Sequence, residues 1–481
     1  MTSMRFVITA VLGLVLLTFS AAIAVEKGDT EVIVIKARRI HTLNGAPIDG
    51  GTVVIRNGRI EAVGRDLAVP EGARVIARPD GVVTPGLIDA CCTIDPEIPE
   101  EATGWPFEGG QPSLWRWLGE YAAHDHSDPD HVCTPECGGR PVSSADMPLA
   151  SATLPTFTWT EQSSEVTPHR LVIDSVNLFS NDFARLLKGG VTTVYVSADS
   201  SEVIGGRGTI LKTGGPLSER VVRRADAVKA SLGGDPSDRG LRNFLPPYYG
   251  PPPSILTRRP TTRMGVEWVF RKAFYDAQRV QDGREIYGAD MPPRQAIPVL
   301  LQVLAGEVPL RIQARLQLDI FTALRLTAEF NLKFTLEEAT EAYRCLPQLK
   351  QAGVPVIFGP LYMTPKGFRS LTDEVSRPRL NSPKQLADAG IEFALTAQEL
   401  RDEEGLVRQA MLAVQSGLTP EQGLRAVTAT PAALLGLSDQ AGVVAPGAAA
   451  DLVVWSSEPL DATSRPLVVL INGRVVLEEG N

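Results

Sequence analysis

Histidine and cysteine are the scarce residues of this 481-residue chain, which contains five of each. Because imidazole nitrogens and thiolate sulfurs are preferred ligands of zinc and related metals, a site that needs many of them must draw on this short list. Basic charge is also in deficit, with 47 Lys and Arg against 56 Asp and Glu and a net charge of −9. A protein without a basic surplus cannot displace counterions from a polyanion, so we expect no nucleic-acid partner.

Long apolar runs are missing except near the N-terminus. Arg5 is followed by an apolar run over residues 6–19 and then by small residues up to Ala24. This order is typical of an export signal, and the run is shorter than the ~20 residues that span a membrane. We expect residues 1–24 to be removed on export to the periplasm or the cell exterior, with no membrane span in the mature chain. The alternative is a retained membrane anchor.

Both ends of the expected mature chain carry short β-rich segments. Two of them flank the Asn-Gly pair at residues 57–58, and two more flank the Asn-Gly pair at residues 472–473. Asn-Gly is the pair that a type I′ hairpin turn prefers. Neither end has enough strands to bury a core by itself. We therefore predict one small β-sandwich made from residues 25–85 together with residues 442–481.

The middle of the chain alternates between apolar strand-like runs and helix-like segments. For example, an apolar run at residues 333–336 precedes a helix-like segment at residues 341–351. Continuous apolar strands that alternate with helices are typical of a parallel sheet covered on both faces. We predict an α/β fold, a (β/α)8 TIM-like barrel over residues 86–441, with an insertion at about residues 105–169.

Several motifs along the chain carry a family resemblance. Residues 83–89 read VTPGLID, residues 190–194 read GVTTV and residues 336–343 read LEEATEAY, and further motifs include residues 417–428. Together they resemble the amidohydrolase superfamily, in its imidazolonepropionase-like branch, over nearly the whole expected mature chain. The resemblance implies a barrel with a sandwich built from both chain ends, and hydrolysis by a water bound to a divalent metal ion. A fold by itself does not assign a function.

The positions where the resemblance implies metal ligands or the general base carry other residues. In chain order they are Cys91, Thr93, Gln313, Arg315, Glu338 and Gln398. The relatives have His-x-His on the first and fifth strands, His on the sixth and Asp on the eighth, and an amide such as Gln398 cannot accept a proton as that Asp does. Arg315 would add a fixed positive charge beside any cation. We predict no metal here and a salt bridge between Arg315 and Glu338 in its place.

A lysine and three cysteines lie near these motifs. Lys212 lies near the fourth-strand position where some relatives carry a carboxylated lysine, and we do not assign it that role. Cys91 and Cys92 are adjacent in a strand and point to opposite sides, so they do not bridge each other. We expect these two thiols to be buried and Cys345 to be free.

The insertion holds a second group of candidate ligands. They are His124, His126, His131, Cys133 and Cys137. In an extended segment His124 and His126 point to the same side, so a metal such as Zn is one reading of the group. The other reading is a polar loop with a disulfide between Cys133 and Cys137, as expected of an exported protein.

Two functions are compatible with these features. The first is an exported amidohydrolase-like pseudoenzyme, without a cofactor, that has lost metal-dependent hydrolysis and binds or scaffolds a small molecule or a protein. The alternative is a hydrolase of carbon–nitrogen bonds, non-peptide or dipeptide, with one divalent metal such as Zn in a rebuilt site. Metal content separates the two, because without the ion this chemistry has no nucleophile. An oligomer is compatible with both.

Overall fold

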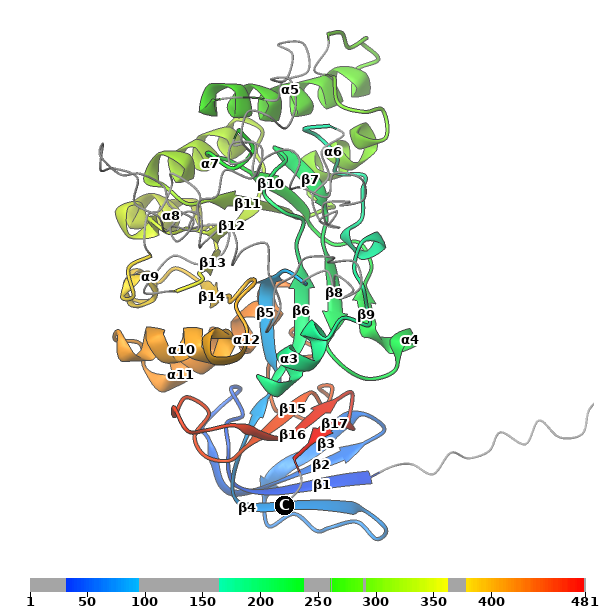
Figure 1. Cartoon of the computed structure of the whole chain (residues 1–481), viewed down its shortest axis with the longest axis vertical. Helices are drawn as coiled ribbons and strands as arrows, with labels where there is room; N and C mark the ends of the chain where they lie inside the picture. Colours follow the sequence, from blue (N-terminus) through cyan, green and yellow to red (C-terminus); the bar gives the residue numbers. More distant parts are fainter. Residues whose placement is uncertain are drawn as a thin grey trace, which may run out of the picture.

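The computed structural model describes residues 32–94, 164–237, 260, 262–288, 291–361 and 378–479. The strands in these ranges form three hydrogen-bonded sheets. Figure 1 shows one sheet at one end of the molecule and the other two, with most of the helices, at the opposite end. No helix within the described ranges is long and apolar enough to cross a membrane.

Two predictions lie outside these ranges. One is the export signal at residues 1–24. The other is the group of ligands in the insertion, namely His124, His126, His131, Cys133 and Cys137. The end of the predicted insertion is described, and there Val166 forms a β-bridge with Ile204. The signal, the metal reading and the disulfide reading all stay predictions.

The first sheet contains strands from both ends of the chain. Its strands are β1 (Val32–Ile40), β2 (Ile48–Arg56), β3 (Arg59–Arg65), β4 (Arg74–Pro85), β15 (Leu452–Trp455), β16 (Pro466–Ile471) and β17 (Arg474–Glu478). The order is β17-β16-β15-β4-β1-β2-β3, and the two ends join where β15 pairs antiparallel with β4. One apolar core contains side chains from both ends. The ends therefore pair as predicted, although the order describes one continuous sheet and does not by itself divide it into the two layers of a sandwich.

The two Asn-Gly turns of this sheet are confirmed. Asn57 and Gly58 have φ values of 52° and 77°, and Asn472 and Gly473 have φ values of 48° and 73°. Both residues of each pair are thus left-handed, as a type I′ turn requires. The turns also pack on each other, since a Cβ at Gly58 would lie 2.7 Å from the Asn472 carbonyl oxygen. Glycine is needed there for its conformation and for the close approach.

The remaining strands form a six-stranded and a four-stranded sheet. The larger has the order β14-β13-β12-β11-β10-β7 and the smaller the order β5-β6-β8-β9. Their bounds are β5 (Leu87–Cys92), β6 (Val191–Val196), β7 (Ile204–Arg207), β8 (Thr209–Lys212), β9 (Val221–Arg223), β10 (Val228–Ser231), β11 (Leu310–Ala314), β12 (Phe334–Glu338), β13 (Val356–Phe358) and β14 (Phe393–Leu395). Strands β10 to β14 are parallel, as are β5 and β6, whereas β7, β8 and β9 pair antiparallel.

These two sheets differ from the closed barrel ladder that we predicted. Among the described residues no strand pairing joins β5 to β14, where a barrel would close. The side chain of Asp89 spans that seam, because its Oδ1 accepts from Thr396 Oγ1 at 2.6 Å and its Oδ2 from the Ala397 amide at 3.0 Å. The parallel α/β core is as predicted. In place of one closed barrel of hydrogen-bonded strands, the structure has two mixed sheets.

Helices follow the parallel strands in the expected alternation (Figure 1). They are α3 (Asp182–Lys188), α4 (Leu217–Arg220), α5 (Arg263–Gln281), α6 (Ala296–Leu304), α7 (Gln317–Glu329), α8 (Leu346–Ala352), α9 (Ser382–Ala389), α10 (Leu406–Gln415), α11 (Pro420–Arg425) and α12 (Ala429–Leu434). Thr419 and Gln422 form a capping box at the start of α11. The capping box gives hydrogen-bond acceptors to two backbone N–H groups that have no partner within the helix.

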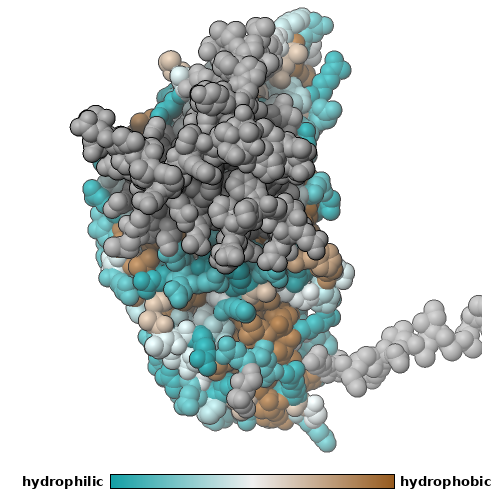
Figure 2. Space-filling model, viewed as in Figure 1, coloured by the Kyte–Doolittle hydropathy of each residue, from teal (hydrophilic) through white to brown (hydrophobic). Residues whose placement is uncertain are grey.

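The visible surface of the described residues is largely hydrophilic (Figure 2). A group of hydrophobic residues appears on the body that contains the seven-stranded sheet. Single exposed apolar side chains such as Val75, which is 46% exposed, are normal for a folded protein. The main apolar surface lies inside, between the sheets and the helices.

Removing the C-terminal strands should destabilise the whole first sheet. Deletion from Gly442 onward leaves β4 without its partner β15 and exposes the core that both ends share. We expect an insoluble chain or a much lower thermal midpoint, because the remaining strands cannot bury that core. A chain that ends after Glu478 keeps all seven strands and is the control. An unchanged midpoint after the larger deletion would contradict the paired ends.

Candidate functional site

The candidate site lies at the carboxyl ends of parallel strands. Arg315 directly follows β11, Glu338 is the last residue of β12, and Gln398 comes three residues after β14. Because the carboxyl ends of parallel strands meet at one edge, their side chains come together there. This edge is where active sites of barrel enzymes are found.

The guanidinium of Arg315 is the centre of the site. Its Nε donates to Glu338 Oε2 at 2.5 Å, which confirms the predicted salt bridge. Its Nη1 and Nη2 donate to Asp235 Oδ1 and Oδ2 at 2.6 and 2.7 Å. Burial alone would lower the pKa of Arg315, which is 8% exposed, but the charges of Asp235 and Glu338 raise the pKa well above its ordinary value. Arg315 therefore stays charged while it serves two carboxylates.

Asp235 is the residue that the sequence analysis missed. It lies four residues after β10, beyond a turn in which Gly233 has a φ of +118°. A Cβ at Gly233 would lie 2.7 Å from Asp319 Oδ2, so only glycine fits this turn. Gln313 Nε2 also donates to Asp235 Oδ2, at 3.4 Å. The available signal was an Asp directly after two glycines at the end of an apolar strand.

Gln398 links the other predicted positions. Its Nε2 donates to Glu338 Oε1 at 3.3 Å and lies 3.9 Å from Cys91 Sγ. Thr93 meets this group only through its backbone amide, which donates to the Gln398 carbonyl oxygen at 3.5 Å. The structure thus brings five of the six predicted side chains into one connected group, with Thr93 beside it.

The backbone is strained at two of these positions. Glu338 has a φ of +65° and Gln398 a φ of +52°, in the left-handed region that few residues other than glycine adopt. Such strain persists only where the surrounding structure imposes it, and it gathers at functional sites. The two side chains therefore meet because the fold imposes this backbone.

The thiol of Cys91 is buried beside these groups. Burial raises the pKa of Cys91 far above its ordinary value, and the nearby Glu337 carboxylate adds to this effect. Cys91 is therefore a neutral thiol in this environment at neutral pH. Cys91 and Cys92 are buried without a bridge between them and Cys345 is free, as predicted, and Cys345 is buried as well.

A second group of buried charges lies next to the first. Glu337 accepts from Arg311 Nε at 2.5 Å and also pairs with Lys229. Arg311 lies over the ring of Tyr195, with its Cζ atom 3.7 Å from the ring centroid. Burial alone would raise the pKa of Glu337, but the charges of Arg311 and Lys229 lower the pKa below its ordinary value.

Lys212, which we considered near the site from the sequence, lies elsewhere. It is the last residue of β8, where it pairs with Asp451 and donates to Thr193 Oγ1 at 3.0 Å. Lys229 on β10 is instead the lysine beside the candidate site, because β10 is the neighbour of β11. The strand order decides which of these two lysines lies beside the site, and residue patterns do not give that order.

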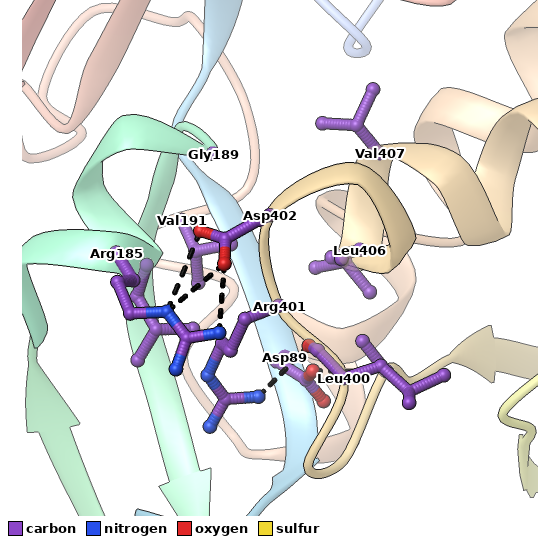
Figure 3. Close-up of a pocket in the computed structure, with 12 residues that line it drawn as sticks. Asp89, Arg185, Gly189, Val191, Leu400, Arg401, Asp402, Leu406 and Val407 are labelled. Atoms are coloured by element: carbon purple, nitrogen blue, oxygen red, sulfur yellow. Dashed lines mark hydrogen bonds and ion pairs between the residues drawn. The ribbon is translucent and has the colours of Figure 1, made fainter. Parts of the chain in front are cut away.

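A pocket next to the site is lined by residues around Arg401 (Figure 3). Arg401 Nε and Nη2 donate to Asp182 Oδ1 and Oδ2, both at 2.8 Å, and Nη1 donates to the Gln398 carbonyl oxygen at 2.5 Å. Figure 3 shows the Arg185–Asp402 pair beside Arg401. Arg401 thus fixes the loop that carries Gln398 to helix α3.

Comparisons with known proteins agree with this architecture. Residues 389–477 match the model of the amidohydrolase family. Amidohydrolase tasK of Hapsidospora irregularis is 26% identical over 339 residues, which are 66% of this chain and 34% of that protein. The crystal structure of an amidohydrolase from Thermotoga maritima MSB8 matches with a TM-score of 0.70 at 25% identity, over 93% of this chain and 100% of that one.

The chain belongs to the amidohydrolase superfamily. It spans about a third of the length of the curated relative that it matches. The crystal structure of A. niger ochratoxinase also matches, with a TM-score of 0.50, 14% identity and coverage of 94% of this chain and 97% of that one. At that identity the likeness concerns the fold alone.

The divalent metal that this superfamily implies does not fit the residues of this amidohydrolase-like site. The carboxylates of Asp235 and Glu338 are bound to a guanidinium that cannot lose its charge. Gln398 offers only a weakly ligating amide. In the part of the chain that the structure describes, no three His, Cys, Asp or Glu side chains gather to hold a metal ion.

Removal of the Arg315 charge should destabilise the protein strongly. Arg315→Met removes the guanidinium that pairs with the buried carboxylates of Asp235 and Glu338, a defect that typically costs ~3–5 kcal/mol. Adding Glu338→Gln should recover part of the loss, and adding Asp235→Asn as well should recover most of it. Urea unfolding of the three variants measures this coupling. Independent, additive effects would show that the three side chains do not interact.

Glu337 should make stability depend on acid pH. Its pKa is lowered from 4.5 in the folded protein, so its contribution is fully present above pH 4.5 and is lost as the pH falls through the folded pKa. The difference in unfolding free energy between the wild type and Glu337→Gln should therefore shrink between about pH 7 and about pH 3. Urea unfolding across that range tests it. A difference that stays constant or grows would contradict the lowered pKa.

Proposed function

We propose that this member of the amidohydrolase superfamily does not carry out metal-dependent hydrolysis and acts as a binding or scaffold protein. The observation that carries the proposal is the Arg315 guanidinium, which is bonded to both carboxylates at the strand ends. These ends are where the resemblance implies a divalent ion. A small molecule or a protein is the proposed partner.

Two steps of metal-dependent hydrolysis lack their groups in this site. A metal lowers the pKa of a bound water and offers it an open position, whereas a guanidinium only donates hydrogen bonds. The proton of that water must also be taken by a base. Gln398 stands at the position that we align with this base, and its amide cannot accept a proton. The described site therefore supports binding better than hydrolysis.

Binding of a cation to the same carboxylates would require Arg315 to leave them. Arg315, Asp235 and Glu338 are all buried. Moving the guanidinium away would leave either the arginine without its partners or the incoming ion next to a fixed positive charge, and both arrangements are costly. This argument supports the first function over a rebuilt metal site at the same strand ends.

A hydrolase of carbon–nitrogen bonds is equally consistent with membership of the superfamily. It would need one divalent ion such as Zn, held by ligands beyond the described residues, among them His124 and His126.

The proposal has three further parts. They are membership of the imidazolonepropionase-like branch, a closed barrel with its sandwich, and export to the periplasm or the cell exterior. Within the described ranges no strand pairing joins β5 to β14, and what supports the barrel is that Asp89 bonds Thr396 and Ala397 across that seam.

Metal content tests the proposed function directly. Protein purified without chelators should hold less than about one-tenth equivalent of Zn, Mn, Fe or Ni, because amide and guanidinium groups stand at the ligand positions. Elemental analysis measures it. One equivalent that is abolished by Glu338→Ala or Cys91→Ala would contradict the proposal. One equivalent removed only by changing His124 or His126 would contradict it in favour of a site in the insertion.

A further inference from the structure

We propose that Arg315 is a binding group for a small carboxylate ligand, and that Asp235 occupies this place from within the chain. The inference rests on the proposed function, because it assigns a ligand class to the same site. It follows from the geometry of the Arg315–Asp235 contact, from the turn that carries Asp235, and from two polar atoms beside them.

The contact of Arg315 with Asp235 is the one that a free carboxylate would make. Nη1 and Nη2 each donate to a different oxygen of Asp235, at 2.6 and 2.7 Å. This two-bond arrangement is how an arginine recognises a carboxylate of any origin. Glu338 uses the remaining Nε, and so it orients the guanidinium without covering the pair of nitrogens that faces Asp235.

Asp235 is the carboxylate that can be exchanged. Glu338 is the last residue of β12 and also accepts from Gln398, so its position is fixed by the sheet and by a second side chain. Asp235 lies beyond β10 on a turn that contains Gly233 and Gly234. Glycine permits backbone changes that other residues resist. A ligand carboxylate can therefore replace that of Asp235 without moving a strand.

Two buried polar atoms beside this contact indicate what else the ligand carries. Gln313 Oε1 and Ser231 Oγ have no hydrogen-bond partner among the described residues. Gln313 Nε2 donates to Asp235 Oδ2. Ser231 on β10 is the register partner of Gln313 on β11. A buried polar atom without a partner is costly, so a ligand that offers a donor there gains affinity. The ligand class is a small carboxylate with a hydroxyl or N–H group on the adjacent carbon.

Binding of three small probes tests the inference. Acetate carries only the carboxylate, glycolate adds the neighbouring hydroxyl, and acetamide has the same size as acetate without the charge. Asp235→Ala removes the carboxylate that competes with the ligand from within the chain. Acetate and glycolate should therefore bind this variant at least about tenfold more tightly than the wild type. Glycolate should bind more tightly than acetate, and acetamide should not respond. Titration calorimetry on the full chain in a buffer free of carboxylates measures all three.

Three further variants control the experiment. Asp235→Asn keeps the shape of the side chain and removes its charge, so it should give an intermediate affinity if the alanine variant folds poorly. Asp235→Ala combined with Arg315→Met should lose the gain. Asp402→Ala is the matched control, because it removes the carboxylate partner of the surface residue Arg185, and it should not increase binding.

Three results would overturn the inference. They are no gain in Asp235→Ala and Asp235→Asn, an equal gain when Arg315 is also replaced, and an equal gain in Asp402→Ala. Each titration is paired with elemental analysis of the same sample. A bound metal contradicts the proposed function whatever the probes do, whereas metal-free protein that binds no carboxylate contradicts only this inference.

Discussion

The buried guanidinium of Arg315 is the interaction on which the candidate site depends. It holds Asp235 and Glu338 together, and the amides of Gln313 and Gln398 reach the same two carboxylates. Two carboxylates this close would repel each other and would be costly to bury without a cation. The fixed charge of the guanidinium offsets this repulsion and the cost of burying the two carboxylates.

The site is also balanced by the charges next to it. Lys229 and Arg311 surround Glu337, so the two groups together contain three cations and three anions. Each carboxylate has a cation in direct contact, which offsets the cost of its burial. The removal of any one partner without a replacement therefore leaves an unpaired charge inside the protein, which is costly.

Contacts between distant parts of the chain hold this arrangement in place. Asp89 binds Thr396 across the seam between the two sheets, and Arg401 joins the loop of Gln398 to Asp182 on α3. Both contacts span more than 200 residues of sequence. The side chains at the strand ends are thus positioned by side chains from elsewhere as well as by their own strands.

The sequence by itself determined the local features and one contact of the site. The hairpin turns at Asn57 and Asn472 and the capping box at Thr419 follow from residue types at short spacing. The Arg315–Glu338 pair followed from the position of both residues at the ends of predicted parallel strands. Only the tertiary structure decided that Asp235 shares this arginine and that Lys229, rather than Lys212, lies beside it. The physical reason is that strand order and register, and the path of the turn after β10, depend on the packing of the whole core, which short residue patterns do not encode.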